Sequence, residues 1–327
     1  MTTTPTLRPM TITEILDGAF RIYRKHVLTF IGIAALLQVP MIILYSVFML
    51  TIYKGAMTDL MSFTTKTPTI APGTNPLSFF PTVSYFTMLG FGLLLGLLQG
   101  LIIHNLISGA LARAIASSYI GEPMGILEAY RIGWKRFFSL IAASILPSTI
   151  SFILLMLVGG VLGLIIMLGV MGNNSSNTSI GLIILGVVLA GLFMIAAFVV
   201  SIIVYIRFML STQAVMLEDA GPIVALRRSW NLTKGGFWRA VGLVTIMGII
   251  IYFVAGIPGA ALNMAIQLAI RDPETVIMWS TLGSVLNQLG LIIAMPLQFA
   301  TYTLLYYDQR VRKEAFDLEL KIQQAAL

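Results

Sequence analysis

The sequence predicts an all-α integral membrane protein in which six transmembrane helices form three hairpins, each preceded by a cytoplasmic amphipathic helix in the membrane interface. Three observations lead to this fold class. Hydrophobic residues make up 58% of the 327 residues and charged residues only 10%, against about 25% charged in a typical soluble domain. Six apolar runs are each long enough to cross a bilayer. A basic amphipathic stretch precedes the first, third and fifth of them.

The first amphipathic stretch, residues 11–26, shows this pattern most clearly. Apolar residues recur at helical spacing on one face and charged residues on the opposite face. They are Ile12, Ile15, Ala19, Ile22 and Tyr23 on the first, and Glu14, Asp17, Arg21 and Arg24 on the second. Thr11 and Glu14 have the spacing of a capping box, which predicts the start of the helix. Because an apolar run follows directly, we expect this helix to lie flat at a membrane surface.

A similar arrangement returns at residues 113–136, where Pro123 is placed as a first helical residue, and at residues 218–239, which Pro222 opens. The letters AFRI at 19–22 align with AYRI at 129–132 and, with a few residues inserted later, with ALRR at 225–228. We interpret this as three parallel repeats within one membrane domain, 11–307. Convergence among juxtamembrane helices is the alternative. The repeats are approximately 11–112, 113–217 and 218–307, between a disordered N-terminus, 1–10, and a charged cytoplasmic tail, 308–327.

The expected spans are approximately 27–53, 82–110, 137–171, 180–206, 240–270 and 276–307. A polar loop is expected from Lys54 to Pro81. Prolines predict a kink at Pro40 and a break near Pro258. The 35-residue run from 137 to 171 would be about 52 Å long as a helix, longer than a hydrocarbon core of about 30 Å. We therefore expect a bend near Pro147, with the true span after it.

Glycines at steps of four predict seams where another helix approaches closely. Gly92, Gly96 and Gly100 form such a series in the second span, and Gly159 and Gly163 form a pair in the third.

The distribution of basic residues predicts the orientation. Of the 20 Lys and Arg residues, 17 lie on the side that carries both termini and the three amphipathic stretches. Lys54, Lys66 and Arg271 lie on the other side. By the positive-inside rule, both termini and the three amphipathic helices are cytoplasmic. The net charge of +7 therefore indicates topology signals and contact with anionic lipid headgroups, and not nucleic-acid binding.

The chain offers little for catalysis. It has no cysteine, which excludes disulfides and thiolate chemistry. It has only two histidines, and it shows no phosphate-binding glycine loop, nucleophile elbow or paired carboxylates. We therefore expect no enzyme activity, no metal and no cofactor.

Six polar residues interrupt the expected spans: His104, Asn105, Asn263, Gln267, Asn287 and Gln288. Polar groups in lipid usually face other helices, so interhelical hydrogen bonds are the simpler interpretation. A proton or substrate site at His104, and a water-filled lumen lined by the amides of the fifth and sixth spans, are the alternatives.

Five arginines are candidates for contact with lipid phosphate: Arg21, Arg113, Arg131, Arg207 and Arg227. Arg113 and Arg207 lie at the inner ends of the second and fourth spans. Snorkelling towards the interface is the simpler interpretation for both, whereas bidentate binding of a phosphate headgroup is the alternative.

Three stretches, EILDGAFRIYRKH (14–26), LRRSWNLTKGGFWR (226–239) and YYDQRVRKEAFDLEL (306–320), resemble a known family. With the six spans, they are similar to a stand-alone membrane domain of the glycerophosphoryl diester phosphodiesterase family. In full-length relatives this domain is joined to a barrel-type hydrolase domain that carries the catalytic His and Glu residues and the metal. None of those residues maps onto this chain, in which only about twenty residues follow the last span. The resemblance therefore implies a bacterial or archaeal inner-membrane protein without the hydrolase activity.

These observations predict a non-enzymatic membrane protein, a scaffold or accessory module that contacts the bilayer, anionic headgroups or a membrane-protein partner. The alternative is a transporter or channel for a lipid-like or small amphipathic solute.

Overall fold

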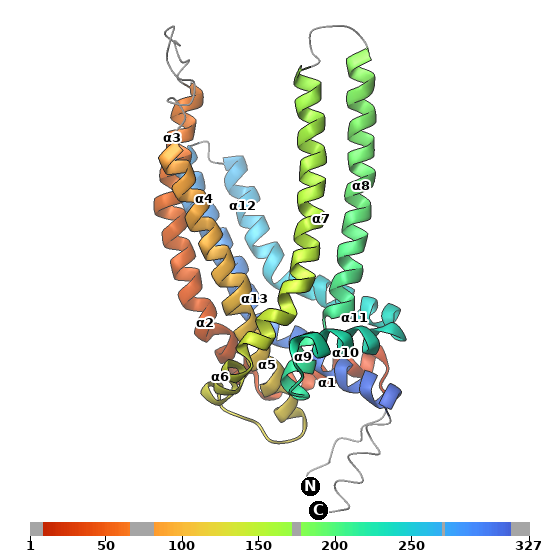
Figure 1. Cartoon of the computed structure of the whole chain (residues 1–327). Coiled ribbons are helices and arrows are strands. Elements are labelled where there is room, and N and C mark those ends of the chain that lie inside the picture. Colours follow the sequence, from red (N-terminus) through yellow and green to blue (C-terminus); the bar gives the residue numbers. More distant parts are fainter. Residues whose placement is uncertain (1–8, 66–81, 172–177, 270–271, 315–327) are drawn as a thin grey trace, which may run out of the picture.

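The computed structural model describes residues 9–65, 82–171, 178–269 and 272–314 (Figure 1). Within these ranges all regular structure is helical. Six described segments are long and apolar enough to cross a membrane, which confirms the predicted number of spans. They are Val27–Met61, Val83–Tyr119, Phe137–Gly160, Val187–Leu217, Phe237–Ala269 and Thr275–Glu314.

Several spans consist of successive helices joined by π-helical turns. Their helices are α2 (Val27–Phe48), η1 (Met49–Tyr53) and α3 (Lys54–Thr65) in the first span, and α4 (Thr82–Leu97), η3 (Leu98–Ile103) and α5 (His104–Tyr119) in the second. The remaining ones are α7 (Phe137–Met171), α8 (Thr178–Phe208), α11 (Phe237–Ile251), η4 (Tyr252–Gly256), α12 (Ile257–Ala269) and α13 (Pro273–Glu314).

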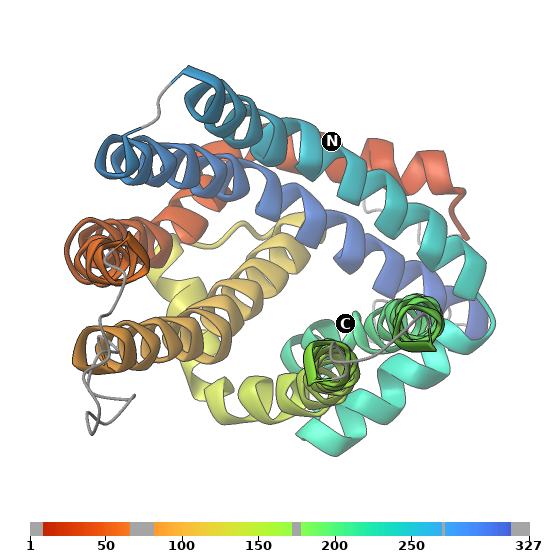
Figure 2. The ribbon, with the colours of Figure 1, turned by 90° about the horizontal axis from the view of Figure 1, so that it is seen from above.

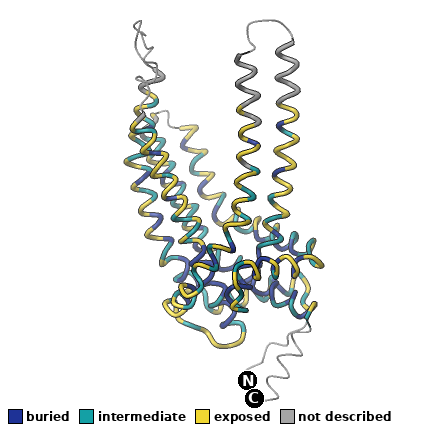
Figure 3. The backbone as a smooth tube through the Cα atoms, viewed as in Figure 1, coloured by how far each residue is buried: buried dark blue, intermediate teal, exposed yellow. Residues whose placement is uncertain are grey.

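Four shorter helices gather at the end of the molecule where α1 begins and α13 ends (Figure 1). These are α1 (Ile12–Lys25), α6 (Ile126–Lys135), α9 (Ser211–Leu217) and α10 (Pro222–Lys234). We call this end, with the lower parts of α5 and α13, the base. Buried residues concentrate in the base, whereas the helices above it expose much of their surface (Figure 3). That exposed surface carries many large apolar side chains, as expected where lipid covers it.

Helix α13 runs through the middle of the assembly and packs against α1, α2, α5, α11 and α12 (Figure 2). Its lower half is largely buried. Tyr306 is the largest side chain with no exposed surface, and Ala300, Leu304 and Leu305 are also fully buried. The core therefore lies in the base, around the last turns of α13.

Several helix boundaries differ from the expectation. The loop expected from Lys54 is wrong for its first part, because α3 continues the first span to Thr65. The second span likewise continues to Tyr119, so Arg113 lies inside α5 and not in a surface segment.

Pro123 is not the first helical residue of its segment. α6 begins at Ile126, with Gly125 as its extended N-cap. Gly121, at φ 93°, turns the chain after α5, and the amide of Glu122 donates to the Ser117 carbonyl (2.9 Å). The residues around Pro123 are thus used in a turn. Pro222 does occupy the first turn of α10, as predicted.

The bend and the break predicted at two prolines have different outcomes. Pro147 lies inside α7, which continues through it as one helix. Figure 1 shows α7 leaving the base obliquely and then turning upward beside α8, which agrees with the predicted bend. Near Pro258 the chain stays helical, because the π-helical turn η4 comes directly before it. A π-turn shifts the hydrogen-bond ladder, which accommodates a residue without an amide hydrogen.

The predicted glycine seams are wrong at four of their five positions. A side chain added at Gly96, Gly100, Gly159 or Gly163 would meet no neighbouring atom within 4 Å, whereas one at Gly92 would lie 3.5 Å from the ring of Phe48. The close approach occurs instead between η4–α12 and α13. A Cβ at Gly290 would lie 2.5 Å from the Ala255 Cα, and one at Gly259 would lie 2.7 Å from the Gly283 carbonyl oxygen.

Three base helices, α1, α6 and α10, are each followed by a different long helix. The residue directly before that long helix has a similar backbone conformation in all three cases. His26, Arg136 and Gly236 precede α2, α7 and α11, with φ/ψ of −128°/31°, −106°/10° and −121°/27°. The carbonyl of each accepts a hydrogen bond from the amide four residues later, at 3.1, 2.9 and 2.9 Å. The residues that donate, Phe30, Leu140 and Ala240, are all buried.

The residues aligned by sequence also occupy corresponding positions. Ala19, Ala129 and Ala225 are each fully buried. Arg21, Arg131 and Arg227, two residues later, are each exposed. The third helix has four more residues before its join, about one helical turn, where the alignment requires an insertion. The three repeats stay a prediction.

Two ion-pair clusters hold α13 in the base. Asp308 has no exposed surface and pairs with Arg239 of α11 (2.9 Å) and with Arg312 (3.1 Å). Glu218, in the turn before α10, pairs with Arg228 (2.9 Å). Arg310 (3.3 Å) and the hydroxyl of Tyr306 also bind Glu218. Charges of this kind are stable in a packed region only when paired.

The tail expected from residue 308 is wrong for its first part. Asp308 to Glu314 complete α13, and Gln309 and Val311 are buried there with Asp308. Residues 315–327 and 1–8, for which a tail and a disordered terminus are predicted, lie outside the described residues.

Candidate functional site

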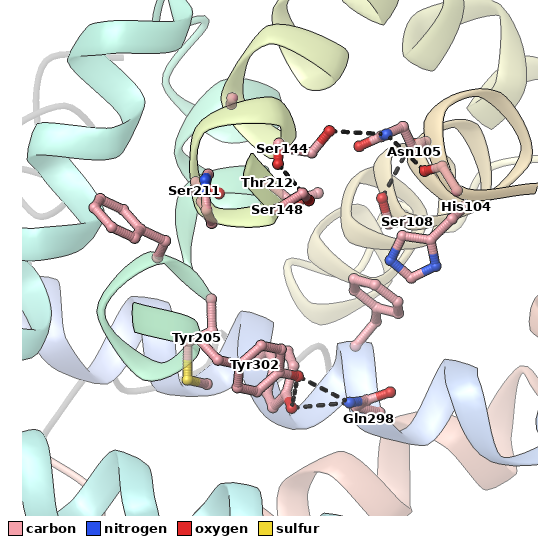
Figure 4. A pocket seen from close by; sticks show the side chains of 16 residues that line it. His104, Asn105, Ser108, Ser144, Ser148, Tyr205, Ser211, Thr212, Gln298 and Tyr302 are labelled. Atoms are coloured by element: carbon pink, nitrogen blue, oxygen red, sulfur yellow. Dashed lines mark hydrogen bonds between the residues drawn. The ribbon is translucent and has the colours of Figure 1, made fainter. Parts of the chain in front are cut away.

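A polar cavity of about 260 Å³ lies between α5, α7, α8, α9 and α13, just above the base (Figure 4). We call it the polar cavity. Its polar lining consists of His104, Asn105, Ser108, Ser144, Ser148, Tyr205, Ser211, Thr212, Gln298 and Tyr302. Gly100, Ala143, Pro147, Phe208, Met209 and Phe299 complete the wall. Hydroxyl, amide and imidazole groups thus meet within helices that are otherwise strongly apolar.

The π-helical turn η3 sets up one wall of the cavity. It ends directly before His104 and leaves the carbonyls of Gly100 and Leu101 available. The Asn105 side-chain amide donates to both, at 3.2 and 3.0 Å, and also to the Ser144 hydroxyl of α7 at 3.0 Å. Asn105 therefore satisfies the irregular backbone of α5 and links it to α7.

The opposite wall is a cluster of two phenols and an amide. The hydroxyls of Tyr205 and Tyr302 lie 2.9 Å apart, and the Gln298 amide donates to Tyr302 (2.9 Å). Tyr205 comes from α8, while the other two come from α13. Because a phenol both donates and accepts, this cluster retains capacity for a ligand hydroxyl.

His104 points into the space between these two walls in Figure 4. Its ring lies 6.5 Å from that of Phe299, and its side chain is exposed to the cavity. Ser108, one turn below, donates to the Asn105 carbonyl (3.0 Å).

The lining contains no Asp, Glu, Lys or Arg. The cavity is therefore suited to an uncharged polar group, because an ion would lose its hydration without gaining an opposite charge. Within the part of the chain that the structure describes, no three His, Asp or Glu residues gather as metal ligands would. The volume is below the 300–1,000 Å³ of typical drug-sized pockets, so it fits a headgroup and not a whole lipid.

The six polar residues predicted within the spans are not brought to one place. His104 and Asn105 line the cavity, whereas Gln267 is exposed on α12. Asn263 donates to the Gly259 carbonyl of its own helix (2.9 Å), and Asn287 donates to the Ala255 carbonyl (3.1 Å). These two amides serve the seam between α12 and α13.

Gln288 belongs to a separate chain of amides. Gln38 donates to Gln288 (2.6 Å), and Gln99 donates to Gln38 (3.1 Å). The three residues come from α13, α2 and η3, and Gln38 is buried. This arrangement is the interhelical hydrogen bonding that the simpler interpretation expects.

None of the five candidate arginines lines the polar cavity. Arg21, Arg131 and Arg227 are exposed on the base. Arg113 and Arg207 are half-buried, and the Nε atoms of both are buried without a hydrogen-bond partner. The Arg207 guanidinium lies over the rings of Trp230 (4.9 Å) and Phe237 (5.1 Å). Cation–π contact thus replaces some of the lost hydration of Arg207.

Sequence reasoning missed most of the cavity. Ser144, Ser148, Tyr205, Gln298 and Tyr302 are isolated polar residues in apolar runs. Their positions on facing helices follow only from the fold. Besides His104 and Asn105, a further local signal could have pointed to this site: Ser144 and Ser148 are four residues apart on one face of a span.

Residues 186–324 match the family model of the membrane domain of glycerophosphoryl diester phosphodiesterase. The match confirms the resemblance for this part of the chain, which contains the stretches at 226–239 and 306–320. No curated protein and no solved structure matches the chain. With the six spans, the match identifies a multi-pass integral membrane protein.

Proposed function

We propose that this chain is a non-enzymatic scaffold or accessory module that binds a lipid-like molecule with an uncharged polar headgroup in the polar cavity. The observation that carries the proposal is the lining itself. Asn105, Ser144, Tyr205, Gln298 and Tyr302 supply donors and acceptors but no charge, at the level where apolar helices leave the base. A headgroup bearing hydroxyls, such as that of a diacylglycerol, matches this chemistry.

The setting of the cavity supports a ligand from the bilayer. The helices that wall it expose large apolar side chains above the base, such as Phe152 and Met156 of α7. An acyl chain attached to a headgroup in the cavity would lie along such surfaces. Binding would therefore not require transfer of the acyl chains out of the hydrocarbon.

The base is proposed to face the cytoplasm of a prokaryotic cell, with both termini on that side, because 17 of the 20 basic residues lie in the sequence segments predicted for that side. In this orientation Arg21, Arg131 and Arg227 are exposed near the inner leaflet. We expect charge reversal at all three to weaken binding of the purified protein to anionic nanodiscs. Unchanged binding would contradict their role in contacting headgroups.

Photocrosslinking tests the cavity directly. The purified full chain is illuminated with a diazirine-bearing diacylglycerol, and adducts are mapped by mass spectrometry. Adducts are expected on the segments that wall the cavity. Ser148→Phe, which fills it, is expected to lower this labelling about fivefold or more. Ser151→Phe, one turn later on α7 and outside the cavity, is the matched control. Equal labelling of the two variants, or adducts spread evenly over α8, would refute the proposal.

A transporter or channel for an amphipathic solute is the second candidate. The chain of amides at Gln38, Gln99 and Gln288, next to two π-helical turns, favours it, because irregular backbone and amides recur along transport routes. Cysteine introduced at Gln99 should then react with a water-soluble thiol reagent. Absence of reaction would remove this candidate.

We also propose that the chain has no hydrolytic activity of its own. The proposal is supported by the sequence, which shows no phosphate-binding glycine loop, nucleophile elbow or paired carboxylates. Phosphodiesterase assays on the purified chain, with divalent metal added, should show no turnover. Robust metal-dependent turnover would refute it.

A further inference from the structure

A second hollow of about 680 Å³ lies on the base, where α10 meets α11 and the end of α13. Its lining consists of Lys234, Gly235, Gly236, Phe237, Trp238, Arg239, Gln309, Arg312 and Lys313. We call it the basic groove. It contains four cationic side chains and no acidic one. Nothing in the polar cavity or its proposed ligand accounts for this charge.

The cations of the groove are only partly neutralised. Arg239 and Arg312 share the carboxylate of Asp308, which is fully buried beneath them. Lys313 donates to the carbonyl of Asn231, which carries no formal charge. Lys234 makes no ion pair with any other described residue. The groove and Asp308 together therefore carry three net positive charges at neutral pH.

The backbone adds further donors. Gly236 is the N-cap of the 15-residue helix α11 and supplies no side-chain cap. The first amides of α11 thus lie at the wall of the groove, next to Arg239, whose Nε is buried without a hydrogen-bond partner. A Cβ at Gly236 would lie 2.5 Å from the Gln309 amide nitrogen, so glycine keeps this wall close to α13. Helix amides and several cations together favour a phosphate group.

An exposed tryptophan at the edge of the groove indicates that the phosphate belongs to a lipid. Trp238 is 81% exposed although it lies at the start of a membrane-spanning segment. An exposed tryptophan at this level is typical of the headgroup region of a bilayer. A phosphate held by the groove would therefore have its acyl chains beside Trp238.

We propose that the basic groove binds the phosphate of one anionic phospholipid, with Lys234 and Lys313 as its cationic contacts. Arg239 and Arg312 complete the positive wall. The two terminal nitrogens of Arg239 stay with Asp308 and the N-terminal segment, so Arg239 adds charge and no direct contact. This site is separate from the polar cavity and does not depend on a ligand there.

Native mass spectrometry of the full chain in detergent tests the proposal. Phosphatidic acid, phosphatidylglycerol and phosphatidylcholine of equal chain length are compared, with inorganic phosphate in a further arm. We expect a one-lipid complex with the anionic lipids, formed about tenfold better than with phosphatidylcholine. The double variant Lys234→Gln, Lys313→Gln should reduce it about tenfold. Both lysines are exposed, so the fold should be retained.

Lys25→Gln with Lys135→Gln removes the same charge from exposed positions of α1 and α6 and is the matched control. It should change the one-lipid complex less than about twofold. Equal loss in both double variants would show a diffuse surface effect and overturn the proposal. Displacement of the lipid by millimolar inorganic phosphate, without preference for acyl chains, would assign the groove to soluble phosphate and overturn the lipid assignment.

Two further measurements keep the outcome unambiguous. Lys234→Glu alone repeats the test if the double variant does not fold, and it should abolish the preference for anionic lipid. A retained preference would refute the proposal. Ser148→Phe should leave the one-lipid complex unchanged, which separates this site from the polar cavity.

Discussion

Arg239 of α11 and Asp308 of α13 form an ion pair of 2.9 Å, in which the carboxylate has no exposed surface. The same carboxylate accepts a hydrogen bond from the Met10 amide (2.7 Å), and Arg312 donates to the Met10 carbonyl (2.8 Å). One buried acid thus joins the N-terminal segment to the fifth and sixth spans. In sequence, Met10 is about 230 residues from Arg239 and about 300 residues from Asp308.

Asp308→Asn should destabilise the protein strongly. It leaves the Arg239 guanidinium half-buried without its counter-ion, at a cost of about 3 kcal/mol in the free energy of unfolding. Thermal unfolding in detergent measures it. Asp219→Asn is the matched control, because the Asp219 side chain is 74% exposed in its pair with Arg136 and should change stability by less than about 1 kcal/mol. Similar effects of the two substitutions would contradict the role of Asp308.

The contacts of Glu218 predict that the base of the molecule becomes less stable in acid. Burial alone would raise the pKa of Glu218, but hydrogen bonds from Arg228 and Tyr306 and the charges of Arg228 and Arg310 hold this pKa below its usual 4.5. A lowered folded-state pKa stabilises the fold above pH 4.5, and this stabilisation is lost as the pH falls through the folded-state value.

Thermal unfolding between pH 7 and about pH 3 checks this expectation. Glu218→Gln should lower the melting temperature at pH 7 and flatten its decrease in acid. Glu128→Gln, on the exposed side of α6, should leave the shape of the pH profile unchanged. An identical profile for Glu218→Gln and the wild type would contradict the prediction.

Two glycine-to-alanine substitutions should change the free energy of unfolding differently, one lowering it and the other leaving it unchanged or raising it. Gly290→Ala places a Cβ 2.5 Å from the Ala255 backbone and 2.8 Å from the Val254 carbonyl oxygen, so the α12–α13 seam must open. The expected loss is about 1–3 kcal/mol in the free energy of unfolding. Gly96→Ala meets no neighbour within 4 Å and should be neutral or stabilising by up to about 1 kcal/mol. Equal stability of both variants would refute the seam.

The proposed orientation can be tested by cysteine labelling, because the chain has no native cysteine. A single cysteine at Thr275, at the end of α13 far from the base, should react with an impermeant maleimide added to intact cells. One at Lys135, in the base, should react only after the cells are opened. The reverse pattern would invert the topology.

The number of spans followed from the sequence because length and hydropathy alone determine it. Boundaries were less accurate where a helix could continue past its apolar part. Lys54 and Arg113 looked like ends of spans, yet α3 and the lower part of α5 extend beyond them, because their polar residues face other helices or the interface.

The site was harder to predict than the fold. Glycine spacing indicated seams at Gly96 and Gly159, but spacing does not tell which helix faces a glycine, and neither position has a close neighbour. The cavity depends on the register between α5, α7, α8 and α13, which no local pattern contains. His104 and Asn105 were noticed because polar residues are rare in apolar runs, whereas Tyr205 and Tyr302 resembled ordinary aromatic residues of a span.

The α7–α8 pair stands beside the other spans in Figure 1, and most residues of α8 from Val187 to Val200 are exposed. Helices of 35 and 31 residues are longer than a hydrocarbon core, so in a thin membrane we expect them to tilt. Tilting would swing Ser144 and Tyr205 relative to Asn105 and Tyr302. The width of the polar cavity would then depend on the thickness of the surrounding membrane. The fit of the proposed lipid headgroup would differ between short-chain and long-chain bilayers.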